Sequence, residues 1–284
     1  MGEGSMSRRV VIAAAGLVIA GGLGDASAEE PDALVAAMRK AGEARISIAQ
    51  LPPYASLSPS GEPEGYLVEV SAQVLRGLGV AKINAVVTTF DAMIPGLQAR
   101  QVDFVSAGLN ITTPRCEVVV FSAPVTVQQD ALYVASGNPK GLAGYASIAR
   151  DAGVKAAFLA GSSQEAFALK EGVQRAQMIT VPDVQSGIAT VTGGRVDAFV
   201  VGQFSVPAAQ RKDVAMVVDK GSPMTGVGIA FRKADVGARD AYNRGLDKLR
   251  ADGTLERLYG KYGFTNWDVL SKTTKASEIA PGCS

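Results

Sequence analysis

Short strand-like segments alternate with amphipathic helical segments along most of this 284-residue chain. Residues 45–49 alternate as a strand does, and apolar side chains in 67–78 recur at the spacing of a helix with one buried face. Further strands are predicted at 83–87 and 102–107, with Asp91 between them as a helix N-cap. This order predicts an α/β fold with a mostly parallel sheet covered by helices.

The same order recurs in a second unit further along the chain. We expect strands at residues 155–159, 178–181, 196–201 and 226–231, and helices after residue 161 and at 184–191 and 239–250. Two such units joined by extended crossings predict a cleft between them. Open α/β sheets bind ligands at the carboxyl ends of their strands, so the candidate site residues are sought there.

The N-terminus has the pattern of an export signal. Arg8 and Arg9 precede an apolar run at 10–23, which is shorter than the roughly 20 residues that span a bilayer. Residues 26–28 form an A-x-A site, which predicts cleavage after Ala28. The general secretory and twin-arginine routes both stay open. We expect a periplasmic mature protein.

Charge and composition exclude several classes of function. With 28 Lys and Arg against 27 Asp and Glu, nothing favours a nucleic-acid partner. The chain contains no histidine, which excludes Ser-His-Asp and Cys-His catalysis. Two cysteines cannot form a four-thiolate metal site, and we expect neither metal nor cofactor. In an oxidising compartment Cys116 and Cys283 are expected to form a disulfide, the alternative being two free buried thiols.

Two loops at strand ends carry candidate ligand-binding side chains. Tyr54 follows the first strand and offers a ring face, although a core tyrosine would fit the same pattern. The loop from Gly108 ends at Arg115, whose planar fork suits a carboxylate, with Asn110 as a neutral donor. A solvated surface arginine is the alternative interpretation.

A third loop runs through Ser162 and Ser163 into a predicted helix. Hydroxyl groups and free backbone N–H groups at a helix N-terminus favour an anion. An ordinary serine N-cap would have the same sequence.

Four blocks in one order carry a family resemblance. They are FDAMIPGLQARQVDFVSAGLNITTPR at 90–115, the GSSQEA turn, GGRVDAFVV at 193–201 and LDKLRADGTLERLYGKYGF at 246–264. The chain from residue 41 to about 267 resembles the type II periplasmic binding proteins of polar amino-acid ABC importers.

This resemblance implies two lobes that close on a ligand by hinge motion. After a signal peptide at 1–28, lobe 1 would comprise 29–129 and 225–284, and lobe 2 would comprise 130–224. The implied partner is the membrane permease of an ABC importer, and we expect a monomer.

Within that family the chain is most similar to ectoine and hydroxyectoine binders. The similarity rests on the run that ends in Arg115-Cys116, on VPDVQSG at 181–187 and on a C-terminal cysteine after a Ser/Thr-rich tail. It implies that Arg115 and Ser163 hold a carboxylate, and that Tyr54 and Phe90 form two walls of an aromatic box.

The chain departs from the family pattern at several positions. Asn110 stands where a third aromatic wall is expected, and Leu51 stands where an acidic residue precedes the Pro-Pro pair. Gly202 takes the place of the aspartate that binds an α-ammonium group, while Phe204 could replace the missing wall. A delocalised or alkylated cation would fit this pattern best. The predicted ligand-binding residues are Tyr54, Phe90, Gly108, Asn110, Arg115, Ser162, Ser163, Gly202 and Phe204.

We therefore expect a non-enzymatic solute-binding component that takes a small zwitterion, either ectoine, hydroxyectoine or a related cyclic or substituted amino acid. One alternative is a standard polar amino-acid binder. Another is a dehydratase-like enzyme on the same fold, for which Asp91 and Glu165 are the carboxylates in the cleft loops. A sensor or scavenger without a transport role is a third.

Overall fold

The computed structural model describes residues 1–2 and 32–283. The predicted arginine pair, apolar run and cleavage site lie outside the described residues. In the described part of the chain, no helix combines the length and apolar character that a membrane crossing requires.

One five-stranded sheet forms the centre of the first lobe. Its order is β4 (Lys82–Val87), β1 (Glu43–Ile48), β5 (Phe104–Val105), β14 (Ala230–Arg232) and β6 (Val119–Phe121). Strand β1 runs parallel to β4 and β5, whereas β14 is antiparallel to both of its neighbours. The predicted strand at 102–107 is shorter than expected, because β5 has two residues.

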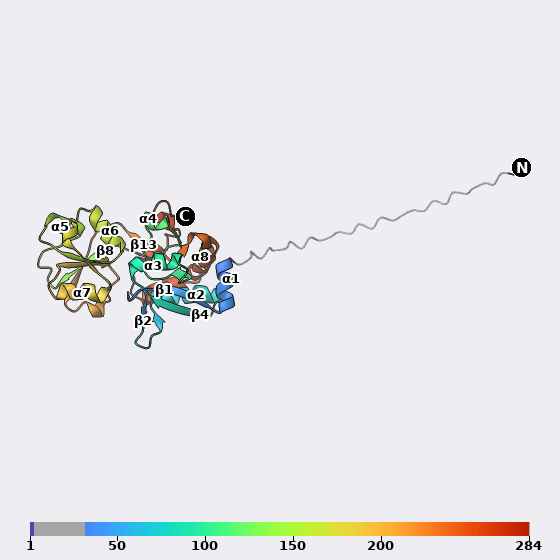
Figure 1. Cartoon of the computed structure of the whole chain (residues 1–284), viewed down its shortest axis with the longest axis horizontal. Coiled ribbons are helices and arrows are strands. Elements are labelled where there is room, and N and C mark those ends of the chain that lie inside the picture. Colours follow the sequence, from blue (N-terminus) through green and yellow to red (C-terminus); the bar gives the residue numbers. More distant parts are fainter. Residues whose placement is uncertain (3–31, 284) are drawn as a thin grey trace. The chain divides into compact units, whose positions relative to one another are not determined.

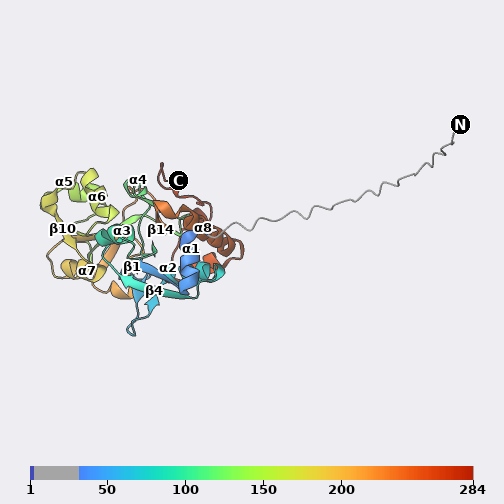
Figure 2. The same ribbon diagram turned by 45° about the vertical axis from the view of Figure 1, so that its right-hand side comes forward.

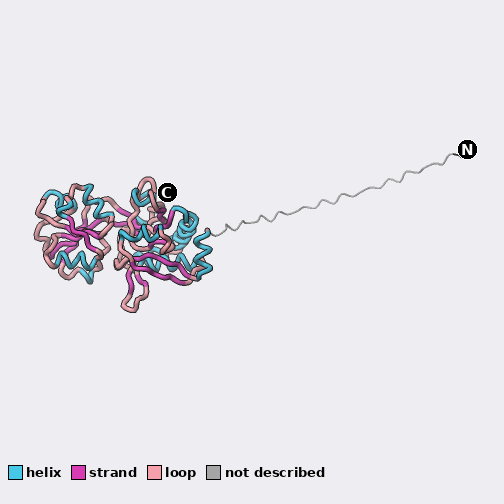
Figure 3. Tube along the Cα trace, in the orientation of Figure 1, coloured by secondary structure: helices cyan, strands magenta, loops and turns pink. Residues whose placement is uncertain are grey.

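A second five-stranded sheet forms the centre of the second lobe. Its order is β10 (Met178–Val181), β9 (Ala156–Leu159), β11 (Ala198–Gly202), β8 (Asp130–Ala135) and β12 (Val214–Val218). Strands β9, β10 and β11 are parallel, and β8 is antiparallel to β11 and β12. Helices surround the strands of both sheets (Figure 3). The predicted two-lobed α/β fold is confirmed.

A short antiparallel ribbon joins β7 (Thr126–Gln128) to β13 (Thr225–Val227). The prediction of one strand at 226–231 is wrong, because β13 pairs in this ribbon while β14 joins the first sheet. Gly228 lies between the two strands, and a Cβ atom there would lie 3.0 Å from Ile111 Cδ1. A small hairpin also pairs β2 (Ser56–Leu57) with β3 (Pro63–Glu64).

Within the described residues, seven α-helices belong to the first lobe. They are α1 (Ala33–Ala41), α2 (Tyr66–Gly77), α3 (Phe90–Gln98), α4 (Thr113–Cys116), α8 (Val236–Ala251), α9 (Thr254–Lys261) and α10 (Trp267–Leu270). Helices α2, α8 and α9 pack against one another. The prediction that Asp91 caps a helix is wrong, because Thr89 is the N-cap residue and Asp91 lies in the first turn of α3.

Three helices belong to the second lobe, namely α5 (Tyr145–Arg150), α6 (Ser163–Lys170) and α7 (Val184–Thr192). Figures 1 and 2 show α5 and α6 on one side of this sheet and α7 on the other. Successive side chains of β8 point alternately to the two sides of the sheet. Leu132 belongs to a core with Tyr145 of α5, whereas Tyr133 belongs to a core with Val184 of α7. Burial on both faces explains the continuous apolar runs of these strands.

Short 3₁₀ turns lie at Arg175–Gln177, Ala208–Gln210, Lys233–Asp235 and Ala276–Glu278.

The predicted disulfide is confirmed. Cys116 and Cys283 are bonded, at a sequence separation of 167. The bond attaches the C-terminal tail to the end of α4, the helix that carries Arg115.

Candidate functional site

A small hollow of about 20 Å³ lies between the loops at the carboxyl ends of strands from both sheets. Such a volume accommodates about one water molecule. Seven of the nine predicted ligand-binding residues line it, namely Phe90, Gly108, Asn110, Arg115, Ser162, Ser163 and Gly202. We call it the inner hollow.

Arg115 links the loops of the two lobes. Its Nη1 donates to Asn110 O at 2.9 Å, and its Nη2 donates to Gly161 O at 3.0 Å. Burial lowers the pKa of Arg115 to about 10, so the guanidinium stays charged near neutral pH. Within the described residues no carboxylate forms an ion pair with it. A half-buried cation that donates only to neutral oxygens is suited to bind an anion.

The hydroxyl side of the inner hollow comes from the start of α6. Ser162 is the N-cap residue, and its Oγ accepts a hydrogen bond from Glu165 N at 3.2 Å. Asn110 Nδ2 reaches across from the first lobe and donates to Ser163 Oγ at 2.7 Å. The ordinary N-cap interpretation thus applies to Ser162, and both serines line the inner hollow.

At Gly161 the backbone of the second lobe lies close to the start of helix α3 of the first lobe. Gly161 has φ +69°, and a Cβ atom there would lie 2.8 Å from the Cα atom of Asp91. A glycine is therefore required both by the left-handed conformation and by the close approach of α3. Its carbonyl is left free to accept the hydrogen bond from Arg115.

Gln128 is a site residue that the sequence did not identify. It lies at the end of β7, is buried, and lines the inner hollow. Its Oε1 accepts from Tyr54 Oη at 2.7 Å, and its Nε2 lies 3.5 Å from Asn110 Oδ1. The sequence contains one indirect signal, which is Gly202. A glycine where a side chain is expected leaves room for a side chain from another strand, and in the structure that side chain is Gln128.

Tyr54 and Phe204 do not line the inner hollow. Both rings pack against Phe264, with ring centroids 5.0 Å and 5.3 Å away. Tyr54 is fully buried and touches the site through its hydroxyl group on Gln128. Phe90 is thus the one predicted aromatic residue whose ring reaches the inner hollow.

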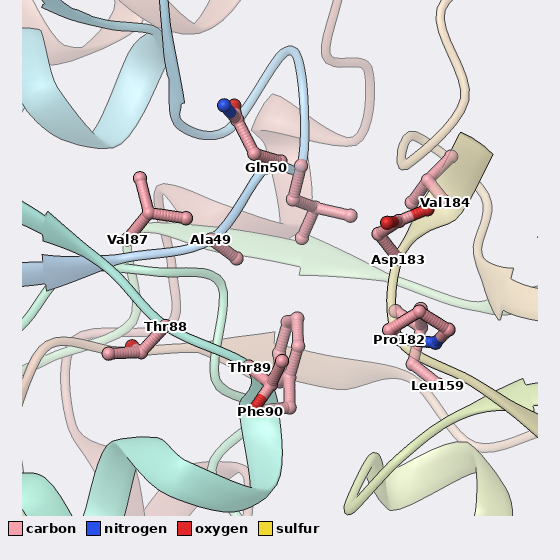
Figure 4. Close-up of a pocket in the computed structure, with 11 residues that line it drawn as sticks. Ala49, Gln50, Val87, Thr88, Thr89, Phe90, Leu159, Pro182, Asp183 and Val184 are labelled. Atoms are coloured by element: carbon pink, nitrogen blue, oxygen red, sulfur yellow. The ribbon is translucent and has the colours of Figure 1, made fainter. Parts of the chain in front are cut away.

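A larger hollow of about 180 Å³ adjoins the inner one, and we call it the outer hollow (Figure 4). The two share Leu51, Phe90 and Leu159 in their linings. The outer hollow also contains Asp183, the N-cap residue of α7, whose Oδ1 accepts from Ser186 N at 2.7 Å.

A buried polar network lies behind α6. Gln164 Nε2 donates to Asp130 Oδ1 at 2.7 Å, and Tyr145 Oη donates to Asp130 Oδ2 at 2.8 Å. Burial raises the pKa of Asp130, and the nearby charge of Asp219 adds to the effect. Because Gln164 follows Ser163 directly, the network holds the first turn of α6 in place.

Two α/β lobes with a polar site between their strand ends define the architecture of a two-lobed ligand-binding protein. Residues 45–266 match the family model of bacterial extracellular solute-binding proteins, family 3, and the chain belongs to this family. It is a solute-binding protein whose family operates outside the cytoplasm.

Several known proteins are similar to this chain. A probable amino-acid ABC transporter periplasmic-binding protein, y4tE of Sinorhizobium fredii, is 30% identical over 244 residues, which are 81% of each chain. The lysine/arginine/ornithine-binding periplasmic protein of Escherichia coli is 29% identical over 225 residues, 74% of this chain and 83% of the relative. The crystal structure of EhuB in complex with hydroxyectoine superposes with a TM-score of 0.81 at 33% identity, covering 88% of this chain and 97% of EhuB.

Proposed function

We propose that this protein is the solute-binding component of an amino-acid ABC importer and that it binds a small zwitterion. One observation carries the proposal: the guanidinium of Arg115 lies half-buried between the lobes, donates only to backbone carbonyls, and has no carboxylate partner among the described residues. A ligand carboxylate would replace the two backbone carbonyls as acceptor and would gain a charge-assisted, bidentate contact.

Neutral donors complete the proposed carboxylate site. Ser163 Oγ and Asn110 Nδ2 bond each other across the inner hollow, and an incoming carboxylate would accept from both. The small volume of the inner hollow fits a closed arrangement of the lobes. Ligand entry then requires the lobes to separate, and hinge motion at the connecting segments provides this.

For the ligand itself we propose ectoine, hydroxyectoine or a related cyclic or substituted amino acid. The likeness to EhuB, whose structure holds hydroxyectoine, supports this class. So does the absence of a carboxylate at Gly202, where the amide of Gln128 fills the space. A standard polar amino-acid binder is the second candidate, favoured by the relative that binds lysine, arginine and ornithine. Beside Gly202, the primary α-ammonium group of such a ligand would meet the amide of Gln128 and no carboxylate.

The remaining parts of the proposal concern location and assembly. We propose a periplasmic monomer that delivers its ligand to a membrane permease, with lobe 1 at 29–129 and 225–284 and lobe 2 at 130–224. The ribbon of β7 and β13 lies next to both lobe boundaries, which supports these limits.

A thermal-shift screen of the purified protein tests the proposed ligand class. The panel comprises ectoine, hydroxyectoine, proline, glycine betaine, and the common amino acids. A ligand that binds only the native state adds about 2.7 kcal/mol of stability at a hundredfold excess over Kd. We expect ectoine or another substituted zwitterion to give the largest shift. A larger shift with lysine or glutamate would favour the second candidate.

A further inference from the structure

The two hollows carry opposite charges. Among the thirteen residues that line the inner hollow, Arg115 is the one with a charge. Among the eleven residues that line the outer hollow, Asp183 is the one with a charge. The linings share Leu51, Phe90 and Leu159, so a single ligand could extend from one hollow into the other.

Asp183 has an oxygen available for a ligand. Its Oδ1 accepts the capping hydrogen bond from Ser186 N, and no hydrogen bond to Oδ2 is found among the described residues. Within residues 32–283 it forms no ion pair. The side chain is half-buried, so a cation that reached it would be partly desolvated.

The opposite wall of the outer hollow contains an aromatic ring. Phe90, the first residue of α3, comes from the first lobe, whereas Asp183 comes from the second (Figure 4). Ring faces and carboxylates both attract organic cations. Buried Leu51 and Leu159 provide apolar surface between the two hollows.

The inner hollow offers a cation no comparable partner. Its lining contains no carboxylate, and the amide of Gln128 fills the space beside Gly202. With a volume of about 20 Å³ against about 180 Å³, it also has less room. A zwitterion with its carboxylate on Arg115 would therefore place its positive charge toward the outer hollow.

We propose that the outer hollow is a cation subsite in which Asp183 and Phe90 bind the positively charged end of the ligand. The inference rests on the proposed function and narrows its ligand class. The preferred zwitterions carry positive charge beyond the α-nitrogen, on a delocalised ring or on a distal guanidinium or alkylated ammonium group. Compact zwitterions such as glycine leave the subsite empty.

Calorimetry on the mature protein tests the subsite. Asp183→Asn removes the charge but keeps a side chain that caps α7 well, and Asp183→Ser is a second neutral capping variant. Asp32→Asn is the matched control, because Asp32 is also a helix N-cap residue whose Oδ1 accepts from a backbone N–H, and it lines neither hollow. The extended probes are hydroxyectoine, 4-guanidinobutyrate and 4-trimethylammoniobutyrate, and the compact probes are glycine and proline.

We expect wild-type protein and the Asp32→Asn control to bind at least one extended probe more tightly than the compact probes. Both Asp183 variants should lose roughly tenfold in affinity for that probe. Their affinity for compact probes should stay within about twofold, and the loss for the extended probe should shrink at high salt.

Unchanged affinity of both Asp183 variants for the extended probes would overturn the subsite. An equal loss for compact and extended probes would overturn it as well, since that result marks a general structural effect. In either case binding that still depends on Arg115 would leave the proposed function intact. If wild-type protein binds no zwitterion in the panel, the proposed function fails together with the subsite.

Discussion

The side-chain amide of Gln128 occupies the space into which any side chain at Gly202 would have to extend. A Cβ atom built on Gly202 would collide with the Oε1, Cδ and Nε2 atoms of Gln128. The two residues come from different strands, β7 and β11, and Gln128 is held there by the hydroxyl of Tyr54. An amide therefore replaces whatever group a residue at 202 would present to the ligand.

We predict that Gly202→Asp is destabilising by itself and tolerated once Gln128 is shortened. The single variant should lower the free energy of unfolding by about 1–3 kcal/mol, because it overpacks a filled site. The double variant with Gln128→Ala should recover most of that loss and bind α-amino acids at least about tenfold more tightly than wild type. Urea denaturation and calorimetry measure both effects. A single variant as stable as wild type, with unchanged ligand preference, would refute the pairing.

Arg115→Lys should reduce ligand affinity by about tenfold or more. A lysine keeps the positive charge but cannot form two parallel hydrogen bonds with a carboxylate. Calorimetry with the best ligand from the thermal-shift panel checks this, and Arg150→Lys on an exposed position of α5 is the control. Near wild-type affinity in the Arg115 variant would show that Arg115 does not bind the ligand carboxylate.

Phe90→Ala should weaken binding by about 1–3 kcal/mol, because the ring supplies both apolar area and a face for the cation. Phe90→Leu separates these contributions, since leucine keeps much of the area and loses the ring face. Relative to Phe90→Ala, we expect Phe90→Leu to recover part of the affinity for proline, whose ring carbons are uncharged. For hydroxyectoine we expect it to recover little. If alanine binds as well as phenylalanine, no cation lies at this ring.

Removing the disulfide with Cys116→Ser and Cys283→Ser together should lower the free energy of unfolding by about 2–4 kcal/mol. The bond restricts the unfolded chain over a separation of 167 residues. Urea denaturation of the wild type with a reductant should reproduce the loss, whereas the reductant should leave the double variant unchanged. Equal stability of the oxidised wild type and the double variant would contradict the expectation.

The pH dependence of stability should contain a contribution from Asp130. Burial raises its pKa above the ordinary value of 3.8, so the native state retains this proton to higher pH than the unfolded chain. The contribution of Asp130 to stability is therefore present at low pH and is lost as pH rises through the raised pKa. Asp130→Asn should remove it, making the slope of unfolding free energy against pH more positive above pH 3.8. Parallel slopes for wild type and variant, from urea denaturation at several pH values, would argue against a raised pKa.

Local patterns accounted for most of the elements and for part of the site. The helix predicted at 67–78 corresponds to α2, and the strand at 178–181 corresponds to β10, because side-chain periodicity depends on neighbours in the chain. The positions of their loops after predicted strands made Arg115 and Ser163 candidates, and the family resemblance assigned both to a ligand carboxylate. The errors at Asp91 and at 226–231 are errors of boundary and pairing, which local pattern constrains least.

The sequence by itself determined the alternation of strands and helices, the two cysteines available for pairing, and the arginine at the loop of β5. Only the tertiary structure decided that Gln128 fills the space beside Gly202, that Tyr54 is buried behind the site, and that Asp183 lines a second hollow next to Phe90. The reason is physical. Periodicity records which face of a segment is buried, whereas the contents of a cavity depend on how segments far apart in the chain pack together.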